Sequence, residues 1–273
     1  MLTVILPASN ESALLGRCIA ALLDSTFEQP TAWQLIVAAN GCRDDTVTIA
    51  RSFVGAASNR GVELTVLNIA QGNKLNAINL GEAEGRGDAL VYIDADVVVE
   101  PSLLAQLAQA LDRPSPTYAT GTLRIAPAVT WATGLYARFW SRLPFVVDGA
   151  PGCGVFAVNR AGRQRWGQFP SIISDDTFVR LHFAPSERVN VPAGFSWPMV
   201  EGFANLVRVR RRQDRGVEEI DRLYPHLLAN EGKSQSNLPR LAAADPIGFG
   251  LYSLVALMTK LPTRSGGTWV RGR

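Results

Sequence analysis

Short hydrophobic runs alternate with segments of helical periodicity along roughly the first hundred residues of the chain. In the first helical segment, apolar residues recur at Leu15, Ile19, Leu22 and Leu23, which fall on one face of a helix. Short apolar strands that alternate with helices of about ten residues indicate βαβ units and a parallel sheet. We therefore expect an α/β fold with a mostly parallel central sheet flanked by helices. The predicted strands are Thr3–Leu6, Leu35–Ala39, Val62–Ile69 and Ala89–Ile93, and the predicted helices are Ser12–Leu23, Asp44–Val54 and Leu75–Ala83.

Beyond Pro101 the strand and helix signals are mixed. We expect helices at Ser102–Leu111 and Asp175–His182, and strands at Tyr118–Ile125 and Gly152–Val158. No internal repeat or low-complexity linker interrupts the chain. The simplest division is a main domain, residues 1–238, followed by a C-terminal helical tail, residues 239–273.

The tail contains a mostly apolar segment at residues 246–261, in which Leu251, Leu254, Val255 and Met258 form one helical stripe. This segment is shorter than the roughly 20 residues that a helix needs to cross a bilayer. A helix that lies in the membrane interface usually has a strongly charged face, and this segment lacks one. We expect it to pack on the main domain or on a second copy in a homodimer, with peripheral membrane contact as the alternative.

Composition places the chain among folded globular proteins. Hydrophobic residues make up 47% of the 273 residues and charged residues 19%, which supports a sizeable core and argues against disorder. The net charge of +3 gives no support for nucleic-acid binding. Three widely spaced cysteines indicate neither a disulfide framework nor a CxxC metal site. The N-terminal residues read as a strand and not as a secretory leader, so we expect a cytoplasmic protein, with the inner face of the membrane as the alternative.

Polar residues follow each predicted strand, at the edge of a parallel sheet where ligands bind. Asp94 and Asp96 come directly after the fourth strand, with Ala95 between them. Two carboxylates at a strand end can converge on one hard cation, Mg²⁺ or Mn²⁺, which completes its shell with phosphate oxygens and water. Such a metal would neutralise charge on a departing diphosphate. An isolated Asp-x-Asp also fits a simple capped turn.

Several ordered motifs resemble those of the family 2 glycosyltransferases, whose fold is the GT-A nucleotide-binding α/β domain. Val4–Glu11 resembles the family's opening strand and Pro-x-x-Asn-Glu turn. Gly72–Gly81 is similar to its Gly-x-Lys-x-x-Ala-x-Asn-x-Gly helix, and Gly87–Asp96 to the strand that leads into its Asp-x-Asp. The resemblance covers roughly residues 2–215 and implies that residues 1–238 are a GT-A catalytic domain.

The resemblance also implies roles for individual residues of the donor site. Pro7, Ala8 and Glu11 would line the nucleoside pocket, and Lys74 would approach the base or the diphosphate. Asp94 would meet the ribose or a metal-bound water, and Asp96 would bind the metal. Ala95, between these two aspartates, would lie beside the bound donor.

One motif departs from the family's pattern. The family usually has an Asp-Asp-Gly-Ser turn after its second strand, and an aspartate there reads the base. This chain has Ala39 and Asn40 before Gly41. Because an asparagine side chain both donates and accepts hydrogen bonds, Asn40 is the candidate for reading a base edge, and a tight turn is the structural alternative.

The acceptor side is predicted from two further segments. Gly149–Arg160 is similar to the family's glycine-rich acceptor strand, where missing side chains let a sugar approach. Asp175 and Asp176 resemble its Glu-Asp motif, which makes Asp176 the expected general base and Asp175 the second candidate. Both aspartates also suit the first turn of a helix, where negative charge is stabilised.

The arginine-rich segment Arg208–Arg215 lies where processive members of the family carry Gln-x-x-Arg-Trp. Gln213 is present, but the spacing and the tryptophan are not, which argues against a polysaccharide synthase. The arginines would either clamp the donor diphosphate or form a solvated face. A metal-ligand role is conceivable for the isolated His182, but a structural role is favoured.

These observations predict an inverting, non-processive glycosyltransferase. It would move a sugar from a nucleotide-sugar donor to the hydroxyl of a glycan, a lipid-linked acceptor or a small molecule, assisted by Mn²⁺ or Mg²⁺. The alternatives are a sugar-1-phosphate nucleotidyltransferase and a non-catalytic sugar-nucleotide-binding protein. A nucleotidyltransferase would need a glycine-rich, basic loop after the first strand, and Pro7–Glu11 contains neither glycine nor a basic residue.

Overall fold

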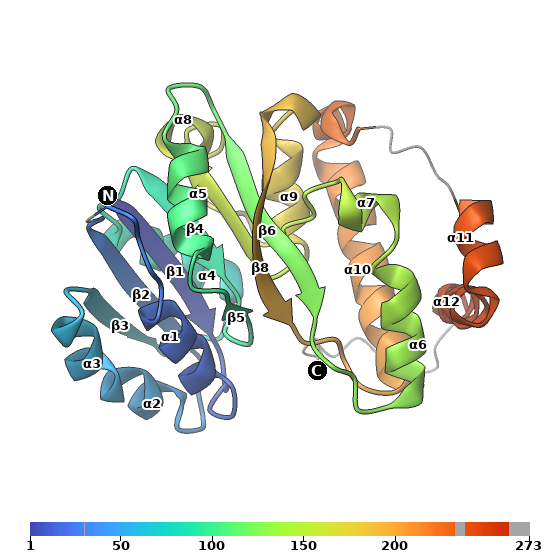
Figure 1. Cartoon of the computed structure of the whole chain (residues 1–273), viewed down its shortest axis with the longest axis horizontal. Helices are drawn as coiled ribbons and strands as arrows, with labels where there is room; N and C mark the ends of the chain where they lie inside the picture. The colour runs from blue at the N-terminus through green and yellow to red at the C-terminus, as the bar shows by residue number, and fades with distance from the viewer. Residues whose placement is uncertain (30, 233–237, 262–273) are drawn as a thin grey trace.

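The computed structural model describes residues 1–29, 31–232 and 238–261. Within them, eight strands form one sheet in the order β3-β2-β1-β4-β7-β6-β8-β5 (Figure 1). Neighbouring strands from β3 to β4 are parallel, as are β6 and β8, whereas β7 runs antiparallel to β4 and β6. The strands are β1 Leu2–Ala8, β2 Trp33–Asn40, β3 Glu63–Ile69, β4 Ala89–Ile93, β5 Val98–Val99, β6 Tyr118–Ile125, β7 Val155–Asn159 and β8 Arg188–Trp197.

Helices flank this sheet and form a separate layer at its far end. Figure 1 shows β1–β3 at one side of the molecule and α6, α10 and α12 at the other. The helices are α1 Leu15–Leu23, α2 Thr46–Ser52, α3 Val54–Asn59, α4 Lys74–Glu84, α5 Leu103–Leu111, α6 Trp131–Trp140, α7 Pro144–Val147, α8 Arg160–Arg163, α9 Asp175–Leu181, α10 Phe203–Leu223, α11 Leu238–Ala244 and α12 Pro246–Thr259, with 3-10 turns η1 Pro185–Glu187 and η2 Pro225–Asn230.

The structure confirms the α/β fold with a mostly parallel sheet. It also differs from the predicted elements in specific places. The helix expected at Asp44–Val54 is divided into α2 and α3 at Phe53, whose N–H bonds to the carbonyl of Ala50 three residues back. The sequence pattern gave no prediction for β8 or α6, and for α10 it showed only the arginine run.

The core lies on both faces of β1 and β2, whose residues are all buried. Burial on both faces explains why these strands read as continuous apolar runs without alternation. Leu15, Ile19 and Leu22 of α1 pack on one face, and Ile78 of α4 packs with Ile5 of β1 on the other. At Gly81 of α4, a Cβ atom would lie 2.9 Å from Ile5 Cγ2. The absence of a side chain there lets α4 approach β1 closely.

The far end of the molecule has its own apolar cluster, in which α12 packs against α6 and α10. Val255 of α12 and Phe139 of α6 are fully buried in it. Asp245 caps α12 by accepting from Gly248 N at 3.0 Å, and Arg138 of α6 donates to both of its carboxylate oxygens at 2.8 and 2.6 Å. The apolar segment of the tail therefore packs on the protein, as expected.

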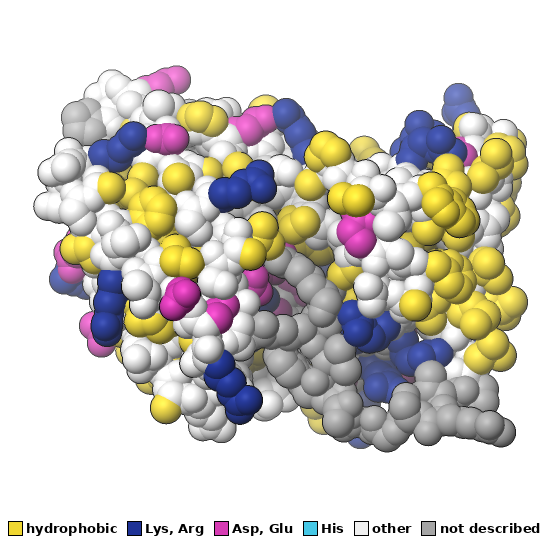
Figure 2. Space-filling view, turned by 90° about the horizontal axis from the view of Figure 1, so that it is seen from below, with side chains coloured by type: hydrophobic (Ala, Val, Ile, Leu, Met, Phe, Trp, Pro, Cys, Tyr) yellow, Lys and Arg dark blue, Asp and Glu magenta, His cyan; other side chains and the backbone are white. Residues whose placement is uncertain are grey.

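One face of α12 stays open to solvent: Ile247, Leu254 and Leu257 are 67%, 46% and 59% exposed. Figure 2 shows hydrophobic side chains gathered on the side where α11 and α12 lie. Within the described residues, no helix has both the length and the apolar character to cross a membrane. Residues 262–273 of the predicted tail lie outside the described residues.

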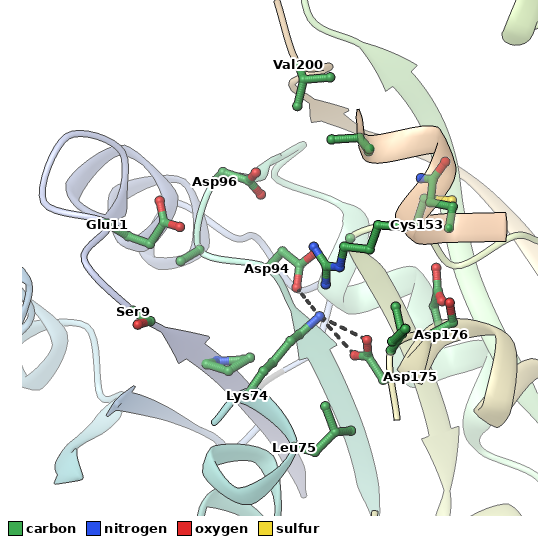
Figure 3. Close-up of a pocket in the computed structure, with 18 of the residues that line it drawn as sticks. Ser9, Glu11, Lys74, Leu75, Asp94, Asp96, Cys153, Asp175, Asp176 and Val200 are labelled. Atoms are coloured by element: carbon green, nitrogen blue, oxygen red, sulfur yellow. Dashed lines mark hydrogen bonds and ion pairs between the residues drawn. The ribbon is translucent and has the colours of Figure 1, made fainter. Parts of the chain in front are cut away.

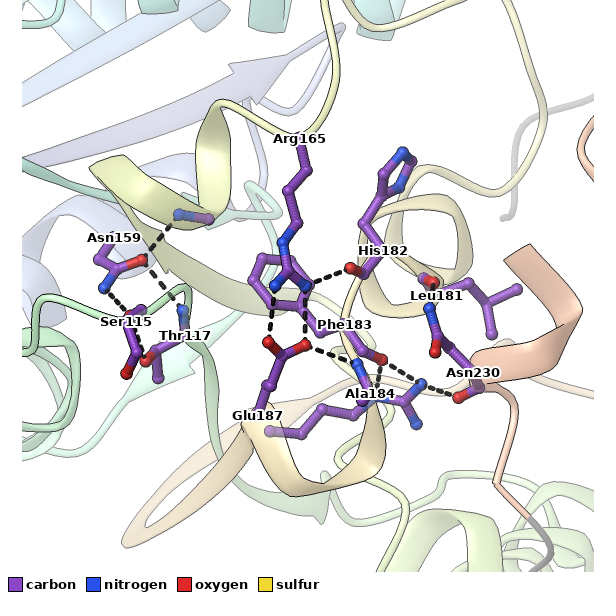
Figure 4. A network of polar contacts seen from close by, with 12 residues as sticks. Ser115, Thr117, Asn159, Arg165, Leu181, His182, Phe183, Ala184, Glu187 and Asn230 are labelled. Atoms are coloured by element: carbon purple, nitrogen blue, oxygen red, sulfur yellow. Dashed lines mark hydrogen bonds and ion pairs between the residues drawn. The ribbon is translucent and has the colours of Figure 1, made fainter. Parts of the chain in front are cut away.

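Polar contacts hold together the part of the sheet that carries the acceptor-side elements (Figure 4). Asn159 Oδ1 accepts from the backbone N–H groups of Thr117 and Gly162 at 3.0 and 2.9 Å, which joins β6, β7 and α8. Arg165 donates to both carboxylate oxygens of Glu187 at 2.7 and 2.6 Å. These charge-assisted bonds fix the turn that precedes β8.

A second network joins α4, α8 and β4. Arg163 Nε contacts the two carboxylate oxygens of Glu82 at 2.9 and 3.0 Å, and the Tyr92 hydroxyl also donates to Glu82. The side chains of Arg163 and Glu82 are 17% and 12% exposed. This network holds the C-terminal part of α4 against β4 and α8.

We expect Glu82→Ala to lower the free energy of unfolding by about 3 kcal/mol, because it leaves the Arg163 guanidinium and the Tyr92 hydroxyl without their shared acceptor in a mostly buried place. Urea denaturation measures the loss. The matched control is Glu84→Ala, an exposed position on the same helix, which should change the value by less than about 0.5 kcal/mol. Equal effects of the two substitutions would contradict a structural role for this network.

Candidate active site

A large cleft opens where β1, β2 and β4 end, with a volume of about 1720 Å³. Its walls come from both halves of the sheet and from α10. Figure 3 shows Ser9 and Glu11 on one side, Lys74 and Asp94 in the middle, and Asp175, Asp176 and Cys153 on the other side. The cleft thus brings together nearly all of the predicted site residues, which come from widely separated parts of the sequence.

The loop after β1 forms the donor-side rim. Pro7 and Glu11 line the cleft. Glu11 N donates to Thr46 Oγ1 at 2.7 Å, and Thr46 in turn bonds to Asp44, so this loop is tied to the start of α2. Ala8 is only 1% exposed and is not among the residues that line the cleft, because its alternate position in the strand points it into the core. The structure therefore corrects the prediction that Ala8 lines the nucleoside pocket.

Asn40, the residue expected to read the base, lines the cleft and also joins neighbouring segments. It is 2% exposed. Its Nδ2 donates to the carbonyl oxygens of Ala8 and Ala38 at 3.0 and 3.2 Å, and its Oδ1 accepts from Asn73 N at 3.0 Å. Both ends of the amide are therefore engaged in joining β1, β2 and the loop before α4.

Lys74 lies between two carboxylates at the centre of the cleft (Figure 3). Its Nζ is 2.8 Å from Asp94 Oδ1 and 2.9 Å from Asp175 Oδ2. Burial opposes the charge on the ammonium, but the two carboxylates outweigh burial and raise the pKa of Lys74 above its ordinary value. The lysine is thus not an exposed surface residue; it links α4, the end of β4 and the start of α9.

The two acidic residues after β4 both line the cleft, with the buried Ala95 between them. The backbone N–H of Asp94 donates to the carbonyl of Gly154 at 2.9 Å, which fixes this turn against the segment before β7. In Figure 3 the Asp96 carboxylate lies away from Lys74. Lys74 neutralises part of the Asp94 charge.

A divalent cation fits this donor set. No cluster of three or more His, Cys, Asp or Glu side chains suited to a metal occurs in the described residues. A structural metal site is therefore not indicated there, but Mg²⁺ and Mn²⁺ bind through one or two carboxylates when substrate phosphates and water supply the other ligands. His182 is not part of the cleft: its Nδ1 is 2.8 Å from the carbonyl oxygen of Phe178, and its ring packs on Trp166, as the favoured structural role requires.

Asp176 is the acidic residue of the cleft with a clearly raised pKa. Burial and then the negative charge of Asp175 raise the pKa of Asp176 to about 6. Its Oδ1 accepts from Thr177 N at 2.7 Å. Asp175 is 6% exposed and is held by Lys74. The two neighbouring aspartates therefore differ: Asp175 is paired, and Asp176 has a proton affinity suited to exchange near neutral pH.

The turn before β7 requires glycine at two cleft positions. Gly152 and Gly154 have φ values of +70° and +78°. A Cβ at Gly152 would collide with the Tyr118 hydroxyl, and one at Gly154 would lie 2.8 Å from Trp197 Cδ1. These glycines lead into a strand and not into a helix, which excludes a dinucleotide-binding fingerprint here.

The structure adds an apolar wall that the sequence reasoning missed. It is formed by side chains of α6, of the segment after β8 and of α10. Trp140 and Trp197 stack with ring centroids 6.0 Å apart. In the sequence, the aromatic residues of 131–140 recur at helical spacing, and this pattern could have predicted the helix that carries part of the wall. The residues of this wall are Tyr136, Trp140, Trp197, Met199, Val200 and Leu206.

The arginines of α10 that line the cleft differ in their contacts. Arg210 pairs with Asp214 at 2.7 Å and contacts the Tyr252 hydroxyl at 3.1 Å, towards α12. Arg211 donates to the carbonyl oxygens of Met258 and Thr259 at the end of α12. Both therefore hold the tail helix in place. The other arginines that line the cleft are Arg208, Arg212 and Arg215.

Comparison with known proteins identifies relatives of this chain. A family model described as glycosyl transferase family 2 matches residues 3–166. The glycosyltransferase AglE of Haloferax volcanii is 31% identical over 94 residues, which cover 34% of this chain and 30% of that protein. The dodecaprenyl-phosphate galacturonate synthase of Rhizobium johnstonii is 24% identical over 113 residues, which cover 41% of this chain and 32% of that protein. The matches span about a third of the length of each of these relatives.

Solved structures share the fold at low sequence identity. The mannosyltransferase PcManGT from Pyrobaculum calidifontis, in complex with GDP-Man and Mn²⁺, has a TM-score of 0.62 and 17% identity, covering 94% of this chain and 74% of that chain. The structure of S. aureus TarS residues 1–349 in complex with UDP-GlcNAc has a TM-score of 0.52 and 13% identity. The match covers 74% of this chain and 59% of that chain. The predicted GT-A fold is thereby confirmed. Because the family model matches more than half of the sequence, this chain belongs to glycosyl transferase family 2.

Proposed function

We propose that this protein is an inverting glycosyltransferase that moves one sugar from a nucleoside-diphosphate donor to an acceptor hydroxyl with the help of a divalent metal. The observation that carries the proposal is the ion pairing of Lys74 with Asp94 and Asp175. It places the acidic turn after β4, on the donor side, next to the pair of aspartates on the acceptor side, inside one cleft of a family 2 chain.

On the donor side, Pro7 and Glu11 line the part of the cleft assigned to the nucleoside. Asp96 is the proposed metal ligand, with Asp94 beside it, and the bound cation would neutralise charge on the leaving diphosphate. Lys74 provides a further positive charge at the same place. The solved relative that contains GDP-Man and Mn²⁺ supports a nucleotide-sugar donor and a divalent metal here.

On the acceptor side, Asp176 is the proposed general base. The acceptor hydroxyl gives its proton to Asp176 as the hydroxyl oxygen attacks the anomeric carbon from the face opposite the leaving diphosphate. Lys74 is ion-paired with Asp175, and burial followed by the charge of Asp175 raises the pKa of Asp176. Positioning of the two substrates and electrostatic stabilisation would account for most of the rate.

The proposed domain division is a catalytic domain of residues 1–238 and a tail of residues 239–273. The missing Gln-x-x-Arg-Trp motif supports transfer of a single sugar. The loop Pro7–Glu11 lacks the glycine and the basic residue that a nucleotidyltransferase would need, and the acidic groups of the cleft argue against a protein that only binds. The cytoplasmic location, and the alternatives of self-association or membrane contact through the tail, stay predictions.

We expect Asp96→Ala to lower metal-dependent donor turnover by about 100-fold or more, because it removes the proposed metal ligand beside the leaving group. Donor hydrolysis and transfer are measured with Mn²⁺, with Mg²⁺ and in excess chelator. Asp221→Ala, at an exposed position on α10, serves as the control and should behave like the wild type. Full wild-type activity in the presence of chelator would refute metal assistance.

We expect Asp176→Asn to lower transfer by about 10²–10⁴-fold while nucleoside-diphosphate affinity stays within a factor of about three, because the amide keeps the shape of the side chain and removes the base. Calorimetry measures binding, and product analysis measures transfer. A parallel loss of nucleotide affinity would indicate a structural role instead. Retained turnover in Asp176→Asn combined with lost turnover in Asp175→Asn would move the base to Asp175.

The raised pKa of Asp176 also predicts two pH profiles. Activity should rise as pH increases through about 6, because the base has to be deprotonated. Stability should change in the opposite sense: a folded-state pKa above the unfolded value means that the folded protein holds the proton more tightly, so stability is lost as pH rises through about 6. Thermal unfolding should therefore show Asp176→Asn becoming more stable than the wild type above pH 6, whereas a constant difference at all pH values would contradict the raised pKa.

A further inference from the structure

Three arginines form a stripe along the side of α10 that faces the cleft. Arg212 follows Arg208 by four positions and Arg215 follows Arg212 by three, so the three arginines lie on one face of the helix. All three line the cleft. The stripe extends over about 10 Å of the helix axis at 1.5 Å per residue. The packing of α12 does not use these arginines, in contrast to Arg210 and Arg211.

This arginine stripe has unused hydrogen-bonding capacity. Within the part of the chain that the structure describes, the stripe makes no hydrogen bond or ion pair with an acceptor, and Arg208 Nε is buried without a partner. Like charges three and four residues apart destabilise a helix, and a buried donor without a partner adds a desolvation cost. A bound anion would relieve both, and the planar guanidinium group is suited to bidentate contacts with phosphate.

The stripe lies on the acceptor side of the cleft. Gly216, next to Arg215, packs so closely on Ser174 that a Cβ atom there would collide with its hydroxyl. One turn further along, Glu219 accepts from Ile173 N at 2.8 Å. The segment that α10 contacts therefore leads directly into the two aspartates at the start of α9. The strands that support the donor nucleoside, β1–β3, lie at the opposite side of the molecule from α10 (Figure 1).

Next to the stripe lies the apolar wall described above. Leu206, two residues before Arg208, belongs to this wall and is 3% exposed. Trp197 and Met199 continue it from the end of β8. Figure 2 shows basic side chains gathered on the part of the surface where α6 and α10 lie, beside the apolar side chains of the tail region. The acceptor side thus combines a basic face with an apolar one, whereas Lys74 and the acidic turn after β4 serve the donor diphosphate.

We propose that Arg208, Arg212 and Arg215 form a phosphate subsite, so that the acceptor is a phosphate-bearing molecule whose hydroxyl group is presented to Asp176. This inference rests on the proposed transferase function and names the class of its acceptor. In the transfer step, the acceptor oxygen forms a bond to the anomeric carbon and its proton goes to Asp176. The bond from that carbon to the donor diphosphate breaks, and the nucleoside diphosphate leaves with the electron pair. The acceptor phosphate is unchanged and serves only for recognition.

The test uses three probes that share a glycerol group: glycerol 3-phosphate, 1-octanoylglycerol 3-phosphate and 1-octanoylglycerol. Calorimetry on the full chain measures their affinity for the wild type and for Arg208→Gln, Arg212→Gln and Arg215→Gln. The matched control is Arg222→Gln, an exposed position in the last turn of the same helix. Each stripe variant should bind the phosphate probes about tenfold more weakly, the loss of a charge-assisted hydrogen bond, and the control should match the wild type.

The two phosphate probes distinguish the sources of the phosphate. Equal affinity for both indicates a water-soluble phosphorylated acceptor, and tighter binding of the octanoyl compound indicates a lipid phosphate that also uses the apolar wall; either result supports the subsite. Binding of both should weaken as salt increases, and 1-octanoylglycerol should bind at least about tenfold more weakly than its phosphate.

Nucleoside-diphosphate affinity is measured in the same variants and should stay within about threefold of the wild type. A loss there, with phosphate-probe binding unchanged, would overturn the proposal and make the stripe a clamp for the donor. Unchanged phosphate binding in all three variants, or an equal loss in Arg222→Gln, would also overturn it. Donor turnover by the wild type distinguishes failure of the subsite from failure of the proposed function. Donor turnover without binding of the phosphate probes would refute the subsite alone. Binding of the phosphate probes without any donor turnover would refute the transferase function on which the subsite rests.

Discussion

The arrangement of the cleft depends on one ammonium group that neutralises carboxylates from two different elements. Asp94, Asp175 and Asp176 would otherwise place three negative charges in a partly buried space, where repulsion and desolvation are costly. Lys74 lies within 3 Å of two of them. It can do so because α4 begins at this residue and packs closely on β1. The ion pair also holds Asp175 beside Asp176, and burial together with the negative charge of Asp175 raises the pKa of Asp176.

The scaffold keeps that lysine in place through contacts that are themselves buried. Burial on both faces makes the central strands rigid, and Asn40 joins two of them to the loop before α4. Further along α4, Glu82 binds Arg163 from the segment after β7. The helix that carries Lys74 is thus fixed at its first turn and near its end. The ammonium group of a long, flexible side chain is positioned more precisely when the backbone that carries it is held in place.

The two sides of the cleft come from two differently built halves of the sheet. The parallel half presents loops at the ends of β1, β2 and β4, the usual place for a nucleotide in an α/β fold. The mixed half, which contains β7, β6 and β8, adds glycines, aromatic side chains and arginines together with α6 and α10. The arginines of α10 that line the cleft are Arg208, Arg210, Arg211, Arg212 and Arg215, and only some of them also contact α12. Arg210 and Arg211 are used for packing, and the stripe that begins at Arg208 stays available for an anion.

The sequence alone determined the parallel half and its acidic turn, because short buried strands and the residues at their ends follow from local patterns. Asp94 and Asp96 were identified as candidates from their position after a strand, and Asp176 from its resemblance to a family motif. The tertiary structure decided what the side chains do: Asn40 and Ala8 belong to the scaffold, and Lys74 bridges residues 20 and 101 positions away. It also decided which side chains form the apolar wall and which arginines of α10 contact α12. Such contacts join segments that are distant in the chain, and no local periodicity encodes which of them meet.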